Sequence, residues 1–187
     1  MLCFVPLVLM GQARAAQPHF SLLSPDLPPG RPIADPYTAN GYGCHGADVS
    51  PALVWSHAPA GTKSFAVTLF DPFTPPVSGW WHWVVYDIPA TVTELKRNAG
   101  APNSADMPPG AKQALPDGDA PEHRYYGACP DAGDPPHRYT ITVFALRVEH
   151  LKVSPHSTAA NVDYEIISNA IAQAQIVRPF ARAKSTP

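Results

Sequence analysis

The chain has 187 residues, which is enough for one domain with a well-buried core. Its formal net charge of −2 argues against the basic surface of a nucleic-acid-binding protein, and this acidic excess is too small for a disordered acidic tail. Its 24 prolines, against roughly 9 expected at an average usage of about 5%, fall between apolar and aromatic runs and so favour a loop-rich β protein over a disordered one.

The first 16 residues are typical of a secretory signal peptide. An apolar run over residues 2–10 leads into ARAA, whose small residues suit cleavage after Ala15 or Ala16. No Lys or Arg precedes the run, which leaves a misassigned start codon or an apolar first strand as alternatives. We expect an exported protein, periplasmic or secreted, with residues 17–187 as a single domain. No other segment is long and apolar enough to cross a bilayer.

Four runs rich in Val, Thr, Ile and aromatic residues predict strands at 52–55, 64–70, 80–88 and 138–148. Stretches rich in proline and glycine separate them, as expected for turns and loops. The runs at 64–70 and 80–88 are apolar on both faces, which is typical of central strands covered on each side. Because no helices alternate with these strands, the sequence predicts a mainly β fold, an antiparallel β-sandwich.

One helix is expected at 161–177. Asn161 is its expected N-cap, and Arg178-Pro179 its expected end. Apolar residues at helical spacing form a single stripe along this helix, which indicates a C-terminal helix packed on the sandwich. The residues at helical spacing are Val162, Ile166, Ile167, Ala170, Ile171, Ala174 and Val177.

Residues 99–128, between the third and last predicted strands, show little periodicity and predict one long loop. Loops of this length inside compact domains tend to be functional. This segment is therefore a candidate for recognition of a partner.

Two cysteines, Cys44 and Cys129, would remain after removal of the signal peptide with Cys3. In an oxidising compartment they can form one disulfide, which would close a loop of about 85 residues and contribute about 4–5 kcal/mol in the chain-entropy model. Two buried free thiols are the alternative. There is no C-x-x-C pair, which excludes zinc-ribbon and thioredoxin motifs.

Side chains able to do chemistry are expected to meet at one end of the sheet. His137 and Tyr139 are i and i+2 on one strand and therefore share a face. His82 lies within an otherwise apolar strand, and Asp71 follows the strand before it. A carboxylate can hold a histidine in its donor tautomer and raise its pKa, so two imidazoles and a phenol offer hydrogen-bond donors. This set predicts a pocket for a small anion: phosphate, sulfate, acetate or a phospholipid head group.

Two other interpretations of these residues stay open. Each histidine can be merely structural, although an imidazole buried without a partner is costly, which weighs against this for His82. Two histidines and an aspartate are also the minimum set for a metal-dependent enzyme, but no H-x-H, H-x-x-x-H or H-E-x-x-H spacing supports a metal site. The chain also lacks the G-x-S-x-G elbow of a serine hydrolase. We therefore expect no catalytic residue, no metal and no cofactor.

Three longer motifs place these residues in a wider pattern. In chain order they are NGYGCHGADVSPALVWSHAPAGTKSFAVTLFDP, SGWWHWVVYDIPA and YYGACPDAGDPPHRYTITVFAL. Their order and spacing closely resemble the phosphatidylethanolamine-binding protein family, specifically its bacterial Raf-kinase-inhibitor-like branch. With the predicted helix they cover most of residues 20–180. The resemblance implies a β-sandwich with one small pocket for anionic or phosphorylated head groups.

The resemblance also implies which residues bind the ligand. The family's D-P-D-A-P loop falls on residues 71–75, where Phe73 replaces the second acidic residue and makes the pocket mouth less acidic and more apolar. The family's pocket histidine, its G-x-x-H-R-Y element and its cysteine-proline lip have counterparts too. Carried over position by position, the implied ligand-binding residues are Asp71, Pro72, Pro75, His82, Cys129, Pro130, His137 and Tyr139.

The expected function is binding rather than catalysis. The family contains lipid binders, kinase-pathway inhibitors and inhibitors of serine proteases. The resemblance therefore implies a small anion or phospholipid head group as ligand, with inhibition of a kinase or serine protease as a further option. The alternatives are an interaction module with a vestigial pocket, which would bind its partner through residues 99–128, and a metal-dependent enzyme. No nucleic-acid partner is expected.

Overall fold

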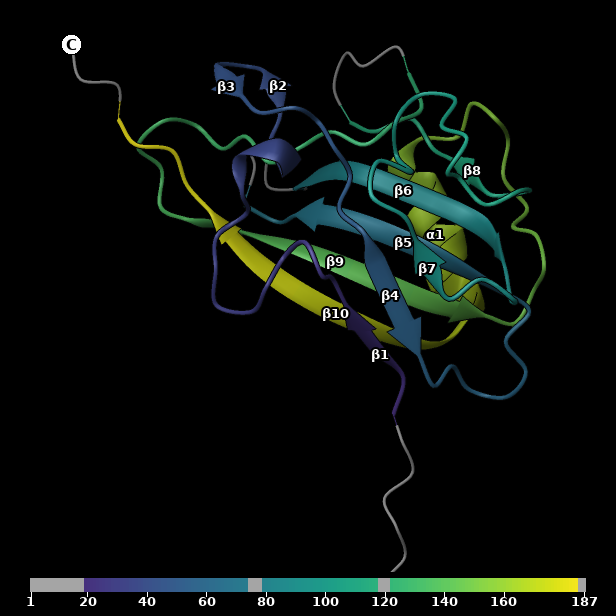
Figure 1. Cartoon of the computed structure of the whole chain (residues 1–187). Coiled ribbons are helices and arrows are strands. Elements are labelled where there is room, and N and C mark those ends of the chain that lie inside the picture. Colours follow the sequence, from purple (N-terminus) through teal and green to yellow (C-terminus); the bar gives the residue numbers. More distant parts are fainter. Residues whose placement is uncertain (1–18, 74–78, 118–121, 185–187) are drawn as a thin grey trace, which may run out of the picture.

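The computed structural model describes residues 19–73, 79–117 and 122–184, which form two packed β layers and a helix (Figure 1). The larger sheet has five antiparallel strands in the order β10-β9-β5-β6-β8. In that order, the strands span Ala170–Phe180, His137–Leu146, Ser64–Asp71, Trp80–Pro89 and Lys112–Gln113. The predicted central strands at 64–70 and 80–88 are thus confirmed as β5 and β6.

A smaller sheet and a hairpin complete the β structure. The smaller sheet has the order β1-β4-β7, with strands at Ser21–Leu23, Leu53–Ser56 and Glu94–Leu95. The hairpin pairs β2 (Asn40–Gly41) with β3 (Cys44–His45) and follows a 3-10 turn, η1, at Asp35–Tyr37. The predicted mainly β fold is therefore confirmed.

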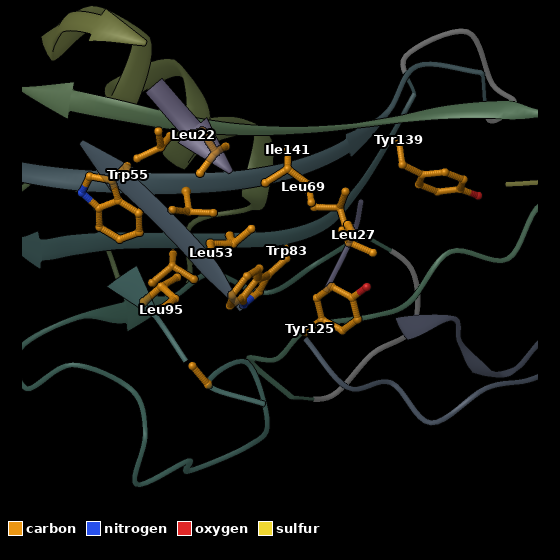
Figure 2. Close-up of a cluster of buried hydrophobic side chains, with 14 of the residues drawn as sticks. Leu22, Leu27, Leu53, Trp55, Leu69, Trp83, Leu95, Tyr125, Tyr139 and Ile141 are labelled. Atoms are coloured by element: carbon orange, nitrogen blue, oxygen red, sulfur yellow. The ribbon is translucent and has the colours of Figure 1, made fainter. Parts of the chain in front are cut away.

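Both faces of the larger sheet are covered, which explains why its central strands are apolar throughout. Alternate residues of β5, such as Phe65 and Leu69, pack with Trp55 of the smaller sheet. Figure 2 shows this cluster, in which Leu53 and Trp55 come from the smaller sheet, and Leu69 and Ile141 come from the larger one. Ala66 of β5 points the other way and packs with Ile166 of the helix α1 (Ala159–Asn169). Full burial of each large side chain stabilises the fold by about 1.5–3 kcal/mol.

The predicted helix at 161–177 is wrong over its second half. Helix α1 ends at Asn169, and the chain continues directly as β10. Side chains of this segment alternate between the core and solvent, as in a strand: Ala172 and Ala174 pack against the core, whereas Gln173 and Gln175 are exposed. The strand also forms a long backbone ladder with β9, in which Arg178 and Pro179, the expected helix end, are paired residues.

The start of the helix also differs from the prediction. Thr158, rather than Asn161, is the N-cap, because its side-chain oxygen accepts a hydrogen bond from the Asn161 backbone N–H at 3.3 Å. Of the predicted apolar stripe, Val162 and Ile166 are buried, while Ile167 is 60% exposed. The expectation that a helix packs on the sandwich is confirmed, with a shorter helix.

Residues 99–128 are more ordered than a single loop. They include β8, and the Ala114 and Asp117 backbone N–H groups donate to carbonyl oxygens of β6, at Val84 and Trp81. The Tyr126 N–H donates to the His82 carbonyl oxygen at 3.0 Å. The described part of this segment therefore runs along β6 and reaches the predicted site.

The proposed signal peptide, residues 1–16, lies outside the described residues. Within the described part of the chain, no helix has the length and apolar character needed to cross a membrane.

Candidate functional site

A cavity of about 210 Å³ opens at the end of the larger sheet where β5 ends and β6 begins. Its walls come from distant parts of the sequence: Tyr42 of the β2–β3 hairpin, Trp80 of β6 and Tyr126 of the 99–128 segment all line it. Asp71, His82 and Tyr139 line it as well. Three of the four side chains expected to converge therefore face the same cavity.

The fourth, His137, lies against Asp71 and does not itself line the cavity. The Nδ1 atom of His137 lies 2.6 Å from Oδ2 of Asp71, so the Nδ1–H group donates to the carboxylate. The other carboxylate oxygen accepts the backbone N–H of Phe73 at 3.0 Å. The second ring nitrogen of His137 faces the Asp134 carboxylate at 3.6 Å. These bonds fix the orientation of Asp71 at the cavity wall.

His82 differs from the donor expected from the sequence. Its Nδ1 atom lies 3.2 Å from the Tyr126 carbonyl oxygen, which can only accept, so this nitrogen carries the hydrogen. Burial lowers the pKa of His82 from 6.5 to about 4, although the nearby Asp71 charge opposes the shift. The imidazole is therefore neutral at pH 7, and with the hydrogen on Nδ1 its Nε2 atom is an acceptor.

Tyr139 supplies a hydroxyl to the cavity. Its ring stacks on His137, at 6.3 Å between centroids, and meets the edge of His82 at 5.3 Å. In Figure 2 its hydroxyl points away from the aliphatic side chains of the core. This oxygen is buried, and its polar neighbours include the Asp71 carboxylate and the Cys129 backbone, neither at full hydrogen-bonding geometry. Burial, with Asp71 nearby, raises the pKa of Tyr139, which keeps the hydroxyl protonated as a donor.

The cavity lining is acidic and aromatic. Besides Asp71, Asp117 and Asp131 line it, whereas no Lys or Arg does so among the described residues. The Asp117 carboxylate also accepts the Trp81 backbone N–H at 2.9 Å. The sequence analysis did not single out Asp117, Tyr126 or Tyr42. The first two lie in the segment predicted to be functional, which was the one available signal.

The remaining residues implied by the resemblance fall into different positions. Cys129 lines the cavity, whereas Pro72 and Pro130 do not. Pro72 is exposed and Pro130 is buried. Pro75 lies outside the described residues.

A disulfide supports the wall that carries Tyr42. Cys44 of β3 is bonded to Cys129, with a Cα–Cα distance of 6.0 Å, so free thiols are not present at these positions. Beside it, the Arg182 guanidinium donates to the carbonyl oxygens of Tyr42, at 3.2 Å, and Gly43, at 2.7 Å. The disulfide and the Arg182 hydrogen bonds thus both fix the hairpin. Arg182 is a positioning residue that the sequence did not predict.

A buried carboxylate links the same hairpin to the part of the wall formed by Gly127. Asp48 accepts the backbone N–H of Gly127 at 2.8 Å and that of Asn40 at 3.0 Å. Gly127 itself permits close packing, because a Cβ atom there would lie 2.1 Å from the Thr38 carbonyl carbon. The cavity wall therefore depends on this glycine and on Asp48.

The metal-centre hypothesis required a cluster of ligands. Among the described residues, no group of three or more His, Cys, Asp or Glu side chains is arranged to hold a metal ion.

Comparisons with known proteins match the chain to a protein family and to individual relatives. A family model described as phosphatidylethanolamine-binding protein matches residues 23–181. The UPF0098 protein YbcL of Escherichia coli is 44% identical over 157 residues, which cover 84% of this chain and 85% of YbcL. The UPF0098 protein YbhB, also from E. coli, is 39% identical over 86% of this chain and 99% of its own length.

Two further matches are a solved structure and a protein named as a putative lipoprotein. The crystal structure of E. coli YbcL, described as a new member of the mammalian PEBP family, superposes with a TM-score of 0.82 at 42% identity, covering 87% of this chain and 98% of that one. The putative lipoprotein LppC of Mycobacterium tuberculosis is 31% identical over 90% of this chain and 75% of its own length.

Proposed function

The chain belongs to the phosphatidylethanolamine-binding protein family, and we propose that it is a non-catalytic binding protein whose cavity takes a zwitterionic phosphorylated head group. The ligand-binding residues are the lining side chains of the cavity, chiefly Asp71, His82 and Tyr139. His137 and the disulfide-bonded Cys129 support them.

The observation that carries this proposal is the make-up of the cavity lining. The buried hydroxyl of Tyr139 lies beside Asp71 but has no partner at full hydrogen-bonding geometry among the described residues, so a phosphate oxygen could accept its hydrogen. An unsatisfied buried hydroxyl costs about 1–3 kcal/mol. The carboxylates of Asp117 and Asp131 would repel a bare anion but attract an ammonium group. Aromatic rings in the lining, such as that of Trp80, also favour a cation near their faces. A head group with both a phosphate and an ammonium satisfies each part of the lining.

The surroundings of His137 favour binding over catalysis. In a nucleophilic hydrolase, the histidine held by a carboxylate presents its second nitrogen to a hydroxyl or thiol. Here that nitrogen faces the Asp134 carboxylate instead. The resemblance to kinase and serine-protease inhibitors stays a prediction, since the cavity chemistry does not bear on it.

We also propose that the protein is exported. A disulfide is stable in an oxidising compartment, and residues 1–16 have the pattern of a signal peptide. A relative that is named a putative lipoprotein supports the same location. In this proposal residues 17–187 are the mature protein.

Isothermal titration calorimetry with phosphoethanolamine, phosphate and ethanolamine tests the proposed ligand. We expect phosphoethanolamine to bind more tightly than either fragment. Tyr139→Phe should weaken it about tenfold, as for loss of a hydrogen bond to a charged group. Tyr164→Phe, at a 69% exposed tyrosine on α1, is the matched control and should bind as wild type. No binding to wild type, or equal binding by Tyr139→Phe, would refute the proposal.

A further inference from the structure

We propose that the Cys44–Cys129 disulfide is a thiol-exchange site, at which a small thiol opens the bond and thereby weakens ligand binding in the cavity. This inference rests on the proposed head-group function, because it concerns the regulation of that same site. The disulfide lies between two cavities: Cys129 lines the ligand cavity, whereas Cys44 lines a second cavity of about 270 Å³. His45, Phe180 and Arg182 also line the second cavity. The bond can therefore be approached from a side that the ligand does not occupy.

A cation lies beside one of the two sulfur atoms. The Nη1 atom of Arg182 lies 3.6 Å from Sγ of Cys129, and the other partners of this guanidinium are backbone carbonyl oxygens. A positive charge next to a cysteine favours its thiolate form. The carbonyl oxygens of Gly41 and Tyr42, 3.7 and 3.6 Å from the same sulfur, carry only partial charges, and water screens the exposed Asp131. Cys129 is therefore suited to leave as a thiolate.

The exchange reaction follows from this position of Arg182. The thiolate of a small thiol attacks the sulfur of Cys44, a sulfur–sulfur bond forms between them, and Cys129 leaves with the electron pair. A second molecule of the thiol then attacks the mixed disulfide, and the released Cys44 takes up a proton. The two small thiols thus give up two electrons and two protons to form one disulfide, and the protein disulfide becomes two thiols. A cavity of about 270 Å³ beside Cys44 suits a thiol of low molecular mass.

Opening the bond should loosen one wall of the ligand cavity. Strands β2 and β3 have two residues each, and a hairpin this short is not stable by itself. The disulfide ties it to Cys129, and Tyr42 at its tip lines the cavity. After reduction, the hydrogen bonds from Arg182 and to Asp48 still hold the hairpin near its place, but less firmly. Because ligand binding must then order this wall, the affinity should fall.

Calorimetry with phosphoethanolamine tests this link to binding. Cys44→Ala breaks the disulfide without changing a residue that lines the ligand cavity. We expect oxidised wild type to bind about tenfold more tightly than reduced wild type or Cys44→Ala, since ordering a few side chains has a cost of this size. Reoxidation should restore binding in wild type only. Circular dichroism before each titration checks the fold, and a reduced protein that is unfolded without urea, or that binds as tightly as the oxidised one, would overturn the regulation.

Reduced glutathione is the probe for the exchange itself. After brief exposure and an acid quench, peptide mass spectrometry should find glutathione on Cys44 rather than on Cys129. Arg182→Gln should slow the exchange about tenfold, because the leaving thiolate loses its counter-charge, whereas Arg182→Lys should keep most of the rate. A purely structural role of Arg182 has the opposite consequence, since a looser hairpin exposes the bond and speeds the exchange. Lys184→Gln removes an exposed charge from the same C-terminal segment and should react as wild type.

The outcomes separate this inference from the proposed function. Glutathione on Cys129, no reaction of wild type, or faster exchange in Arg182→Gln would overturn the exchange site. Binding of phosphoethanolamine that does not respond to reduction would leave the proposed function standing and the regulation wrong. If oxidised wild type does not bind phosphoethanolamine, the proposed function is wrong and its regulation with it, while the exchange at Cys44 is still decided by mass spectrometry.

Discussion

The Nδ1 atom of His137 lies 2.6 Å from the Oδ2 atom of Asp71, and this bond joins the first residue of β9 to the last residue of β5. The backbone pairing of the two strands ends at Phe70 and Thr140, so the side-chain bond extends their connection toward the cavity. Both side chains are buried. Because a bond to a charged group is stronger when water is excluded, this pair fixes the end of the sheet on which the site is built.

Loss of this pair should destabilise the fold. Asp71→Ala leaves the His137 Nδ1–H and the Phe73 N–H without their acceptor, so we expect the free energy of unfolding to fall by about 2–4 kcal/mol. Urea denaturation of Asp71→Ala, His137→Ala and the double variant measures the coupling, which should be about 1–3 kcal/mol. Effects that simply add would show that the two side chains act independently.

The pKa of His82 predicts a loss of stability in acid. Its folded value, about 4, lies below the unfolded value of 6.5, so the unfolded chain takes up a proton first as the pH falls. The stability that the neutral imidazole contributes is therefore complete above pH 6.5 and is lost progressively toward pH 4, by roughly 3 kcal/mol. Urea midpoints of wild type and His82→Gln, measured from pH 7 to pH 4, give the comparison. His82→Gln should have a flatter pH dependence; an unchanged slope would contradict this assignment.

Much of the fold was predictable because its local and global patterns agree. The runs that became β5 and β6 are apolar on both faces, and both faces are covered. The chain from Ala170 to Val177 was not predictable in this way, since its Ala and Ile residues fit a helical stripe as well as an alternating strand. Only the ladder with β9 makes that segment a strand, and such pairing is not visible in local periodicity.

The candidate site was predictable in part for a related reason. His137 and Tyr139 share a strand face, so their proximity follows from spacing alone. Asp117 and Tyr126 reach the cavity, and Arg182 reaches the hairpin beside it, through connections between distant segments, which no local pattern reveals. The role of His82 as an acceptor depends on one carbonyl group, that of Tyr126, and a sequence does not give the position of such a group.

The Cys44–Cys129 disulfide should contribute strongly to stability. It links residues 85 positions apart, and the chain-entropy model gives about 4–5 kcal/mol for a loop of this size. Urea denaturation with and without reductant should therefore show a large drop in the midpoint for wild type. The variant with alanine at both positions should start at the lower midpoint and should not respond to reductant. A wild-type midpoint that is insensitive to complete reduction would refute this.

Asp163 should act on stability in the direction opposite to His82. Burial on α1 raises the pKa of this carboxyl from 3.8 to about 6, because the charged form is disfavoured beside the apolar cluster that holds Val162 and Ile166. Here the folded state takes up the proton first, so stability falls as the pH rises from about 4 to 6 and stays lower above that range.

Neutralising Asp163 should therefore stabilise the protein at neutral pH. For Asp163→Asn we expect a gain of about 1 kcal/mol at pH 7, which allows for solvent screening at this half-buried position, and almost none at pH 3.5. Thermal or urea unfolding at the two pH values measures it. Glu165→Gln removes one negative charge from the same helix and controls for net charge alone. Because the gain comes from relieving burial of a charge, equal gains at both pH values, or the same gain from Glu165→Gln, would rule out this cause.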